Sequence, residues 1–227
     1  MDSRLFSIVS DSFFKILIPG LTATIPLTII AFSLALIIAT ICALIQFSRL
    51  PVLKDLCRFY IWVIRGTPLL VQLYVLFYGL PDLGILLPPF PAAVIVFALN
   101  EGAYAAETIR AALEAVPEGQ IEAGYCIGMS YPQVVRRILL PQAMRTAVPP
   151  LSNEVIAMVK DTSLAANITV AEMFMATQRI IARTYEPLAL YIEVALLYLL
   201  FSTLLTKLQK ILENRLNARG IAGGPVL

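Results

Sequence analysis

The chain has 227 residues, of which 59% are hydrophobic and 14% charged, and its formal net charge is +2. Soluble domains of this size are about half apolar and about a quarter charged, so this composition excludes a soluble globular protein. A mean hydropathy of +0.83 instead fits a chain that resides in a lipid bilayer. The small net charge identifies no partner, because the distribution of charge is what matters in a membrane protein.

Five stretches are long and apolar enough to cross a bilayer, whose core of about 30 Å needs around 20 residues per helix. They predict an all-α membrane protein with a single domain, residues 1–227, and five transmembrane helices. The predicted spans are Ile16–Gln46, Phe59–Leu80, Phe90–Ile109, Ala147–Ile168 and Leu188–Lys207.

The first span carries Pro19 and Pro26, so its outer end is expected to be an interfacial turn that leads into the span proper. The segment before it, Met1–Lys15, has two aspartates beside its two basic residues. That mixture is a poor match to the basic start of a cleavable signal peptide. We expect a retained, non-cytoplasmic tail.

Positively charged loops tend to stay in the cytoplasm, so the Lys and Arg residues predict the orientation. They gather after the first, third and fifth spans, which places the N-terminus outside and the C-terminus in the cytoplasm. The residues predicted to be cytoplasmic are Arg49, Lys54, Arg58, Arg110, Arg136, Arg137, Arg145, Lys207, Lys210, Arg215 and Arg219.

Three cysteines, Cys42, Cys57 and Cys126, have no metal-ligand spacing, and their odd number argues against a disulfide framework. We expect buried thiols that pack as small hydrophobic groups, and no metal site.

The cytoplasmic loop, about residues 111–146, holds charges, glycines and prolines in an order that a simple linker does not need. Ile121–Met129 is expected to form a short helix at the membrane surface, with small residues that permit close approach of another backbone. Ser130 and Pro132 then predict the start of a second helix, which Pro141 is expected to interrupt. The alternative is a basic connector anchored at the lipid headgroups.

The pattern Glu122-Ala123-Gly124, then Gly128, then Ile138 and Leu140-Pro141, resembles the EAA loop of ABC importer permeases. In that family the loop is a cytoplasmic helix that docks into a groove on the ATP-binding subunit. Gly124 stands where the family usually has alanine, and is expected to loosen the helix by about 1 kcal/mol. The resemblance implies an ATPase-coupling role for Glu122, Ala123, Gly124, Gly128 and Met129.

Further segments resemble the polar amino acid branch of this family, which includes cystine, arginine, glutamine and histidine importers. The matching blocks are Arg65 to Gln72, Tyr78 to Pro81, Asn100 to Arg110, Leu140 to Ala143 and Lys160 to Leu164.

The resemblance implies a type I ABC importer transmembrane domain in the cytoplasmic (inner) membrane of a bacterium. The implied partners are a second permease copy or similar subunit, an ATP-binding subunit that carries ATP and Mg, and an extracytoplasmic substrate-binding protein. No nucleic acid is implied. The chain has no Gly-rich phosphate loop, so it is expected to be a transport subunit without cofactors and not an enzyme.

The fourth span contains three ionisable residues, Glu154, Lys160 and Asp161. Each costs about 2.5 to 3.5 kcal/mol at bilayer depth, so they must face protein, water or one another. Glu154 and Asp161 share a helix face with Met158, while Asn153 and Lys160 occupy the adjoining stripe.

The second span contains Gly66 and Pro68, which should disrupt regular hydrogen bonding around Arg65 and Thr67 and so mark a cavity. A zwitterionic amino acid presents a carboxylate and an ammonium, and these side chains offer partners for both. The candidate substrate-binding residues are Asn153, Glu154, Met158, Asp161, Asn100, Arg65 and Thr67. For Asn153 and Glu154 the role is also implied by the resemblance.

Several alternatives stay open. The charges could form structural ion pairs, such as Arg65 with Asp161, and Glu107 with Arg110 is expected to be a local helix pair. A secondary carrier would use Glu154 and Asp161 as proton or sodium sites, and a membrane scaffold would have no pathway.

Two assignments of the substrate also remain open. The blocks from Arg65 to Pro68 and from Thr184 to Ala195 resemble cystine permeases, our best prediction, whereas Glu154 resembles importers of arginine or other basic amino acids. Glutamine is a further alternative.

Overall fold

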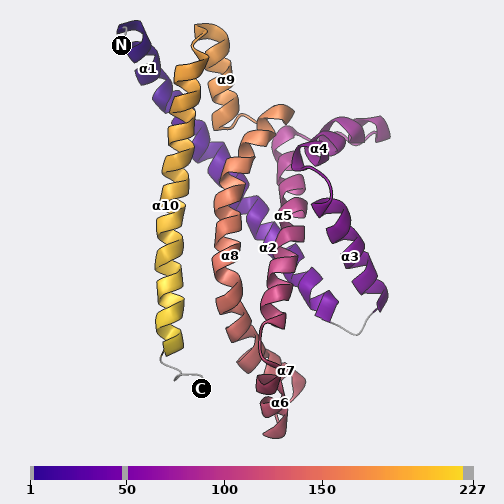
Figure 1. Cartoon of the computed structure of the whole chain (residues 1–227). Coiled ribbons are helices and arrows are strands. Elements are labelled where there is room, and N and C mark those ends of the chain that lie inside the picture. Colours follow the sequence, from indigo (N-terminus) through magenta and orange to yellow (C-terminus); the bar gives the residue numbers. More distant parts are fainter. Residues whose placement is uncertain (1–2, 48–50, 222–227) are drawn as a thin grey trace.

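The computed structural model describes residues 3–47 and 51–221, and this part of the chain is helical with no strand. The all-α prediction is confirmed. Arg49 and the tail beyond Ile221 lie outside the described residues. The α-helices (Figure 1) are α1 (Ser3–Pro19), α2 (Ile25–Phe47), α3 (Pro51–Arg65), α4 (Leu69–Tyr74), α5 (Pro89–Glu114), α6 (Glu118–Cys126), α7 (Tyr131–Val134), α8 (Leu140–Asp161), α9 (Met173–Thr184) and α10 (Pro187–Ile221).

Three helical segments in the described residues are long and apolar enough to cross a membrane: Arg4–Gln46, Pro89–Glu114 and Pro187–Arg215. Pro51–Arg65 and Leu69–Leu83 pass the same test together, with a bend of 102° between them. Helix α8 runs beside α5 (Figure 1) but carries too many charges and prolines to count as an apolar span. Five spans and their orientation therefore remain predictions.

The expected interfacial turn near Pro19 and Pro26 is wrong. The chain stays helical through this region, because a π-helical turn at Gly20–Thr24 joins α1 to α2. The backbone N–H of Ile25 reaches back five residues to the carbonyl of Gly20. This wider turn accommodates the two prolines, whose nitrogens cannot donate hydrogen bonds. Helices α1 and α2 therefore form one long diagonal element (Figure 1).

Helices α2 and α5 pack closely because small residues line their contact. Ala31, Ala35, Ala39 and Ala43 recur every fourth residue along α2, and all four are fully buried. On α5, a Cβ at Gly102 would lie only 3.0 Å from Cγ2 of Ile38. In a membrane, lipid removes the usual hydrophobic driving force for helix association, and small residues at the contact let two helices approach each other closely.

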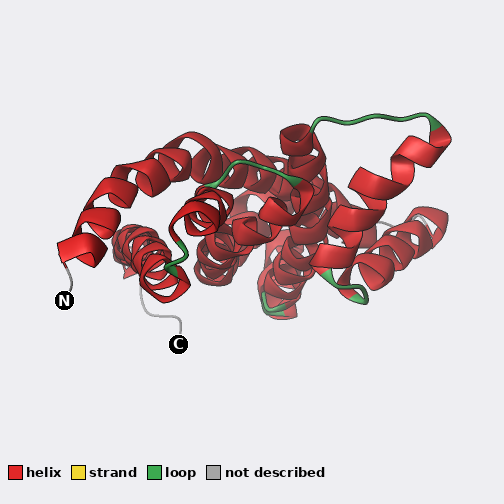
Figure 2. Cartoon of the chain, turned by 90° about the horizontal axis from the view of Figure 1, so that it is seen from above, coloured by secondary structure: helices red, strands yellow, loops and turns green. Residues whose placement is uncertain are grey.

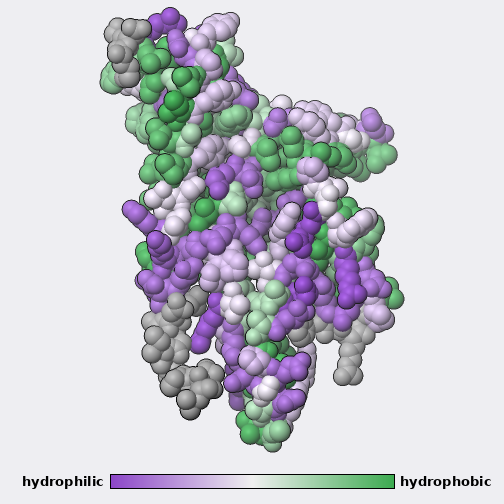
Figure 3. Space-filling model, in the orientation of Figure 1, coloured by the Kyte–Doolittle hydropathy of each residue, from purple (hydrophilic) through white to green (hydrophobic). Residues whose placement is uncertain are grey.

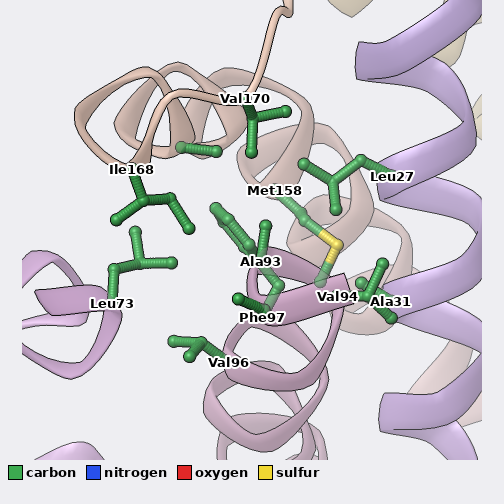
Figure 4. Close-up of a cluster of buried hydrophobic side chains, with 12 residues drawn as sticks. Leu27, Ala31, Leu73, Ala93, Val94, Val96, Phe97, Met158, Ile168 and Val170 are labelled. Atoms are coloured by element: carbon green, nitrogen blue, oxygen red, sulfur yellow. The ribbon is translucent and has the colours of Figure 1, made fainter. Parts of the chain in front are cut away.

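A second contact region joins α8 to α2, α4 and α5. Leu27, Leu73, Phe97, Met158 and Ile168 converge there, from α2, α4, α5, α8 and the 3₁₀ turn at Thr162–Ile168 (Figure 4). Each is at most 2% exposed. This cluster fixes α8 relative to α4 and α5, which is where polar side chains meet.

The two ends of the bundle differ. At one end α6 and α7 project from the bundle, and at the other lie α4 and α9 (Figure 1). Seen from above, α1 and α10 lie side by side at one edge (Figure 2). The C-terminal ends of α2, α5 and α10 point toward the α6 end (Figure 1).

Glu172, immediately before α9, is fully buried and caps that helix. Its carboxylate accepts hydrogen bonds from the backbone N–H of Met175 (2.7 Å) and the hydroxyl of Tyr198 (2.7 Å). Burial raises the pKa of this carboxyl above its ordinary value. The cap ties α9 to α10.

Cys42 and Cys57 are buried as predicted, on α2 and α3. The same expectation is wrong for Cys126, which is exposed. It lies at the end of α6, where the chain turns away from the bundle and most side chains face outward.

Replacing Ala35 with Leu should destabilise the protein, because the added methylenes meet α5 at a contact that leaves no room. Overpacking of this kind costs about 1 to 3 kcal/mol. Thermal unfolding of the detergent-purified protein would measure the change. Ser33→Leu adds comparable bulk at an exposed site of the same helix and should change the midpoint little. Equal effects of the two variants would contradict the close α2–α5 contact.

Candidate functional site

A polar cavity of about 370 Å³ lies between α5, α8 and the start of α4. Its lining includes three carboxylates, one amide and two hydroxyls from the side chains of residues far apart in the sequence. The lining residues are Thr67, Pro68, Leu69, Asn100, Glu101, Tyr104, Glu154, Ala157, Asp161 and Leu164.

Helical spacing explains why these side chains meet. Glu154 and Asp161 are seven residues apart on α8, so they share one face, as predicted. Asn100 and Tyr104 are four residues apart on α5 and face α8. The third wall is the chain between α3 and α4, where Pro68 is extended and the helix is broken. The predicted disruption near Gly66 and Pro68 is confirmed.

Two carboxylates in the cavity have unused acceptor capacity. The Thr108 hydroxyl donates a hydrogen bond to Oε1 of Glu154 (2.7 Å). Oε2 of Glu154 and Oε1 of Glu101 are buried, and their carboxyl groups lie close enough to interact with each other, but neither oxygen accepts a hydrogen bond from any other group among the described residues. Buried acceptors of this kind need a donor, and a ligand ammonium group carries three.

Gln72 holds the broken segment in place. Its side-chain amide donates to the carbonyl of Ile64 (2.8 Å) and the hydroxyl of Thr67 (2.8 Å), and accepts from Nδ2 of Asn100 (3.0 Å). Backbone groups freed by a helix break at this depth must find partners in protein. Gln72 supplies a partner for one of these groups, the carbonyl of Ile64, and connects the helix break to α5.

Arg65 does not form the considered ion pair with Asp161. Its guanidinium lies 3.9 Å from the carboxylate of Glu107 and 5.1 Å from the ring centre of Tyr104. The predicted local pair of Glu107 with Arg110 is confirmed, at 2.8 Å. Arg65 therefore lies behind Tyr104, outside the cavity lining.

The predicted substrate-binding residues divide into two groups. Thr67, Asn100, Glu154 and Asp161 line the cavity. Arg65, Met158 and Asn153 do not: Met158 is 2% exposed within the core (Figure 4), and Asn153 is exposed and accepts a hydrogen bond from Gln209 (3.1 Å).

Sequence reasoning missed Glu101, which lines the same cavity. The available signal was an acidic residue directly after Asn100, inside an otherwise apolar span. In the described residues, no group of three His, Cys, Asp or Glu side chains is placed to hold a metal ion.

The second candidate site is the segment that projects from the bundle, residues 118–131, which we call the docking segment. It begins with α6, whose Glu122 and Ala123 are exposed, as are Tyr125 and Ile127. Ile127 is 79% exposed. Exposed apolar side chains beside charged ones are typical of a protein interaction site.

Two glycines shape the docking segment. Gly128 has φ +81°, a conformation that ends α6 and that only glycine adopts without strain. The backbone N–H of Met129 then donates to the carbonyl of Gly124 (3.1 Å), and that of Gly128 to the carbonyl of Tyr125 (2.9 Å). These two bonds form a Schellman motif.

Gly124 is buried against the next helix, and a Cβ there would lie 2.7 Å from Cδ1 of Ile138. The missing side chain lets α6 pack on the helix that follows, while the expected looseness at Gly124 stays a prediction. Sequence reasoning also missed Tyr125 and Ile127, which alternate with the residues of the recognised pattern.

The helix after the docking segment begins as predicted. Ser130 precedes α7, and its backbone N–H donates to the side chain of Gln133 (2.8 Å). The predicted interruption at Pro141 is wrong. A π-helical turn at Val135–Leu139 lets the N–H of Leu140 reach Val135, so the helix continues into α8.

Residues 34–218 match the family described as "Binding-protein-dependent transport system inner membrane component". The L-cystine transport system permease protein TcyB of Bacillus subtilis (strain 168) is 48% identical over 213 residues, which cover 93% of this chain and 91% of the relative. The octopine transport system permease protein OccM of Rhizobium radiobacter is 38% identical over 209 residues, 88% of this chain and 85% of the relative.

Solved structures show the same architecture. An amino acid ABC transporter crystallised with histidines superposes with a TM-score of 0.87 at 35% identity, over 95% of this chain and 100% of the other. The inward-facing MetNI methionine ABC transporter matches with a TM-score of 0.68 at 15% identity, over 95% and 99% of the two chains. The second likeness concerns the fold alone.

Replacing Gly124 with Leu should displace α6 from Ile138 and so distort the docking segment. We expect the variant to remain folded while its capture of a co-expressed ATP-binding subunit falls, measured by the amount of that subunit that co-purifies. Gly79→Leu is the matched control, because Gly79 lies outside the docking segment and a Cβ there has nothing within 4 Å. Capture that is lost equally in both variants, or in neither, would contradict this packing.

Proposed function

We propose that this chain is the permease for L-cystine in an ATP-driven amino acid importer. It belongs to the family of inner membrane components of binding-protein-dependent transport systems. The 48% identity to an L-cystine permease over 93% of the chain carries this proposal. The chain is the transport component, located in the inner membrane, and it has no phosphate-binding loop of its own.

The polar cavity is the proposed substrate site. Glu101 and Glu154 offer buried acceptors to an ammonium group, and Asn100 and Thr67 offer polar contacts nearby. Cystine has two ammonium groups, so one end of the molecule suits this lining. Arg65, held between Glu107 and Tyr104, lies behind the wall that Tyr104 forms and would act on the site by its charge.

The docking segment is the proposed contact with a separate ATP-binding subunit, which would carry ATP and Mg. Glu122, Ala123 and Gly128 belong to the recognised pattern, while Tyr125 and Ile127 add exposed apolar surface. Gly124 and Met129 hold the segment in shape from within. A substrate-binding protein would deliver the amino acid at the opposite face, and a second permease copy would complete the assembly.

A basic amino acid such as arginine is the second candidate substrate. It is favoured by the lining itself, because the charged side chains of the cavity are all carboxylates. A side-chain cation would then occupy the position that an ammonium group of cystine is proposed to take.

Uptake into proteoliposomes that contain the permease and the ATP-binding subunit tests the proposal. With the substrate-binding protein and ATP present, radiolabelled cystine should accumulate, and arginine, glutamine and histidine should compete poorly. Uptake driven by an ion gradient without the ATP-binding subunit would indicate a secondary carrier. Preferential uptake of arginine would overturn the cystine assignment alone, and no uptake of any amino acid would overturn the importer.

In the same assay, Glu154→Gln should lower uptake at limiting substrate on the order of tenfold or more, because it removes a charge-assisted hydrogen bond worth about 1.5 to 3 kcal/mol. ATP hydrolysis and co-purification of the ATP-binding subunit should persist. Asp11→Asn, an exposed position on α1, is the control and should transport normally. Normal transport by Glu154→Gln would contradict the proposed site.

A further inference from the structure

Glu101 of α5 and Glu154 of α8 meet in the polar cavity. Their carboxyl groups lie close enough to interact, and each keeps one buried oxygen that accepts nothing from any other described group. No Lys or Arg side chain of the described residues lines the cavity, and the chain has no histidine. The two acidic groups therefore meet without a cation of the protein between them.

This contact has a consequence for protonation. Two ionised carboxylates in contact repel each other, and neither has a hydrogen to donate. One proton held between them removes the repulsion and supplies an O–H donor for a hydrogen bond. Carboxyl groups that share a site in this way titrate as a pair. The contact between Glu101 and Glu154 therefore requires one proton while no ligand separates them.

The remaining contacts of the pair indicate which carboxyl group carries this proton. Oε1 of Glu154 accepts a hydrogen bond from the hydroxyl of Thr108 (2.7 Å), as a carboxylate does. The side chain of Glu101 forms no other hydrogen bond in the part of the chain that the structure describes. Glu101 is therefore the donor and Glu154 the acceptor.

The neighbouring charged groups supply no other cation. Asp161 of α8 and Tyr104 of α5 are the other titratable side chains of the lining, and the segment before α4 contributes none. Arg65 lies behind Tyr104, and Lys160 lines the groove beside α10 instead. Among the described residues, no three acidic, His or Cys side chains are placed to hold a metal ion. A proton or an organic ammonium group is the cation that fits the pair.

We propose that Glu101 and Glu154 share one proton in the unliganded permease, and that an ammonium group of the substrate displaces it. The inference rests on the proposed function, because it describes how that cavity accepts its substrate. The O–H bond of Glu101 breaks, its proton passes to water, and the ammonium group donates an N–H to each carboxylate. No electrons are transferred, and the net charge of the site is unchanged because one cation replaces another.

The displaced proton has a polar route out of the cavity. Thr67, Tyr104 and Asp161 of the lining are exposed. Hydrophilic residues also continue over the middle of the face shown in Figure 3, at the height of the apolar helices. Water that reaches these side chains can accept the proton. Substrate and proton therefore compete for the pair, so acidification weakens substrate binding.

Proton release on binding tests the exchange. L-cystine would be titrated calorimetrically into the complex of the permease with its ATP-binding subunit, in lipid nanodiscs at roughly pH 6.5, where cystine keeps its own charges. Buffers of different ionisation enthalpy give the number of protons released. About one per site is expected for the unaltered complex, and close to none for Glu101→Gln, whose amide donates to Glu154 without a proton to lose. Asp11→Asn, exposed on α1, is the control and should match the unaltered complex.

The outcomes separate this inference from the proposed function. Import of L-cystine with no proton released on binding would overturn the shared proton and leave the proposed function standing. Binding of L-arginine in place of L-cystine, with the same release, would support the exchange and overturn the cystine assignment. A complex that binds neither amino acid would overturn both proposals.

The affinity as a function of pH supplies a second measurement. Between roughly pH 5.5 and 7 the amino and carboxyl groups of cystine keep their charges, so changes in affinity report on the protein. The dissociation constant of the unaltered complex should rise by up to about tenfold for each unit of acidification, whereas that of Glu101→Gln should change much less. Equal pH dependence in the two complexes would contradict the displacement.

Discussion

The uninterrupted helical run from Tyr131 to Asp161 is the element on which the rest of the structure depends. At the α-helical rise it spans roughly 45 Å, with the docking segment at one end and the polar cavity at the other. The π-helical turn at Val135–Leu139 keeps the run continuous where Pro141 would otherwise break it. Gly124 seats α6 directly on this run. Displacement of the docking segment therefore acts on the helix that carries Glu154. A nucleotide bound to the ATP-binding subunit favours one conformational state of the transporter only by its differential affinity for that state.

The low polarity of the bilayer explains the arrangement around that helix. The polar groups of α8 cannot face lipid, so they line a cavity with α5 or meet protein or water. The same constraint governs the break before α4, where Gln72 satisfies the carbonyl of Ile64 and contacts Asn100. On the other side of α5, a run of fully buried alanines on α2 allows a close contact without polar groups. Close apolar packing thus supports a site whose polar side chains border a cavity.

The sequence predicted those features that depend on local spacing. The shared face of Glu154 and Asp161, the break near Pro68 and the helix start at Ser130 all follow from chain-local rules. The features it did not predict depend on neighbours that are distant in the sequence. Arg65 pairs with Glu107 because α3 packs on α5, and Met158 turns into the core although it was assigned to the face of the two carboxylates. The prolines of the first span, and Pro141 before the fourth, misled for another reason, since π-helical turns accommodated them.

The most direct measurement of this coupling uses Cys126, the exposed thiol at the end of α6. Cys42 and Cys57 are buried, so a bulky maleimide applied to inside-out membrane vesicles should modify Cys126 selectively. If the docking segment enters the ATP-binding subunit on the cytoplasmic side, modification should be fast in the permease alone and strongly slowed in the assembled complex. Prior modification should then prevent assembly and uptake. Equal modification rates with and without the ATP-binding subunit would contradict the account.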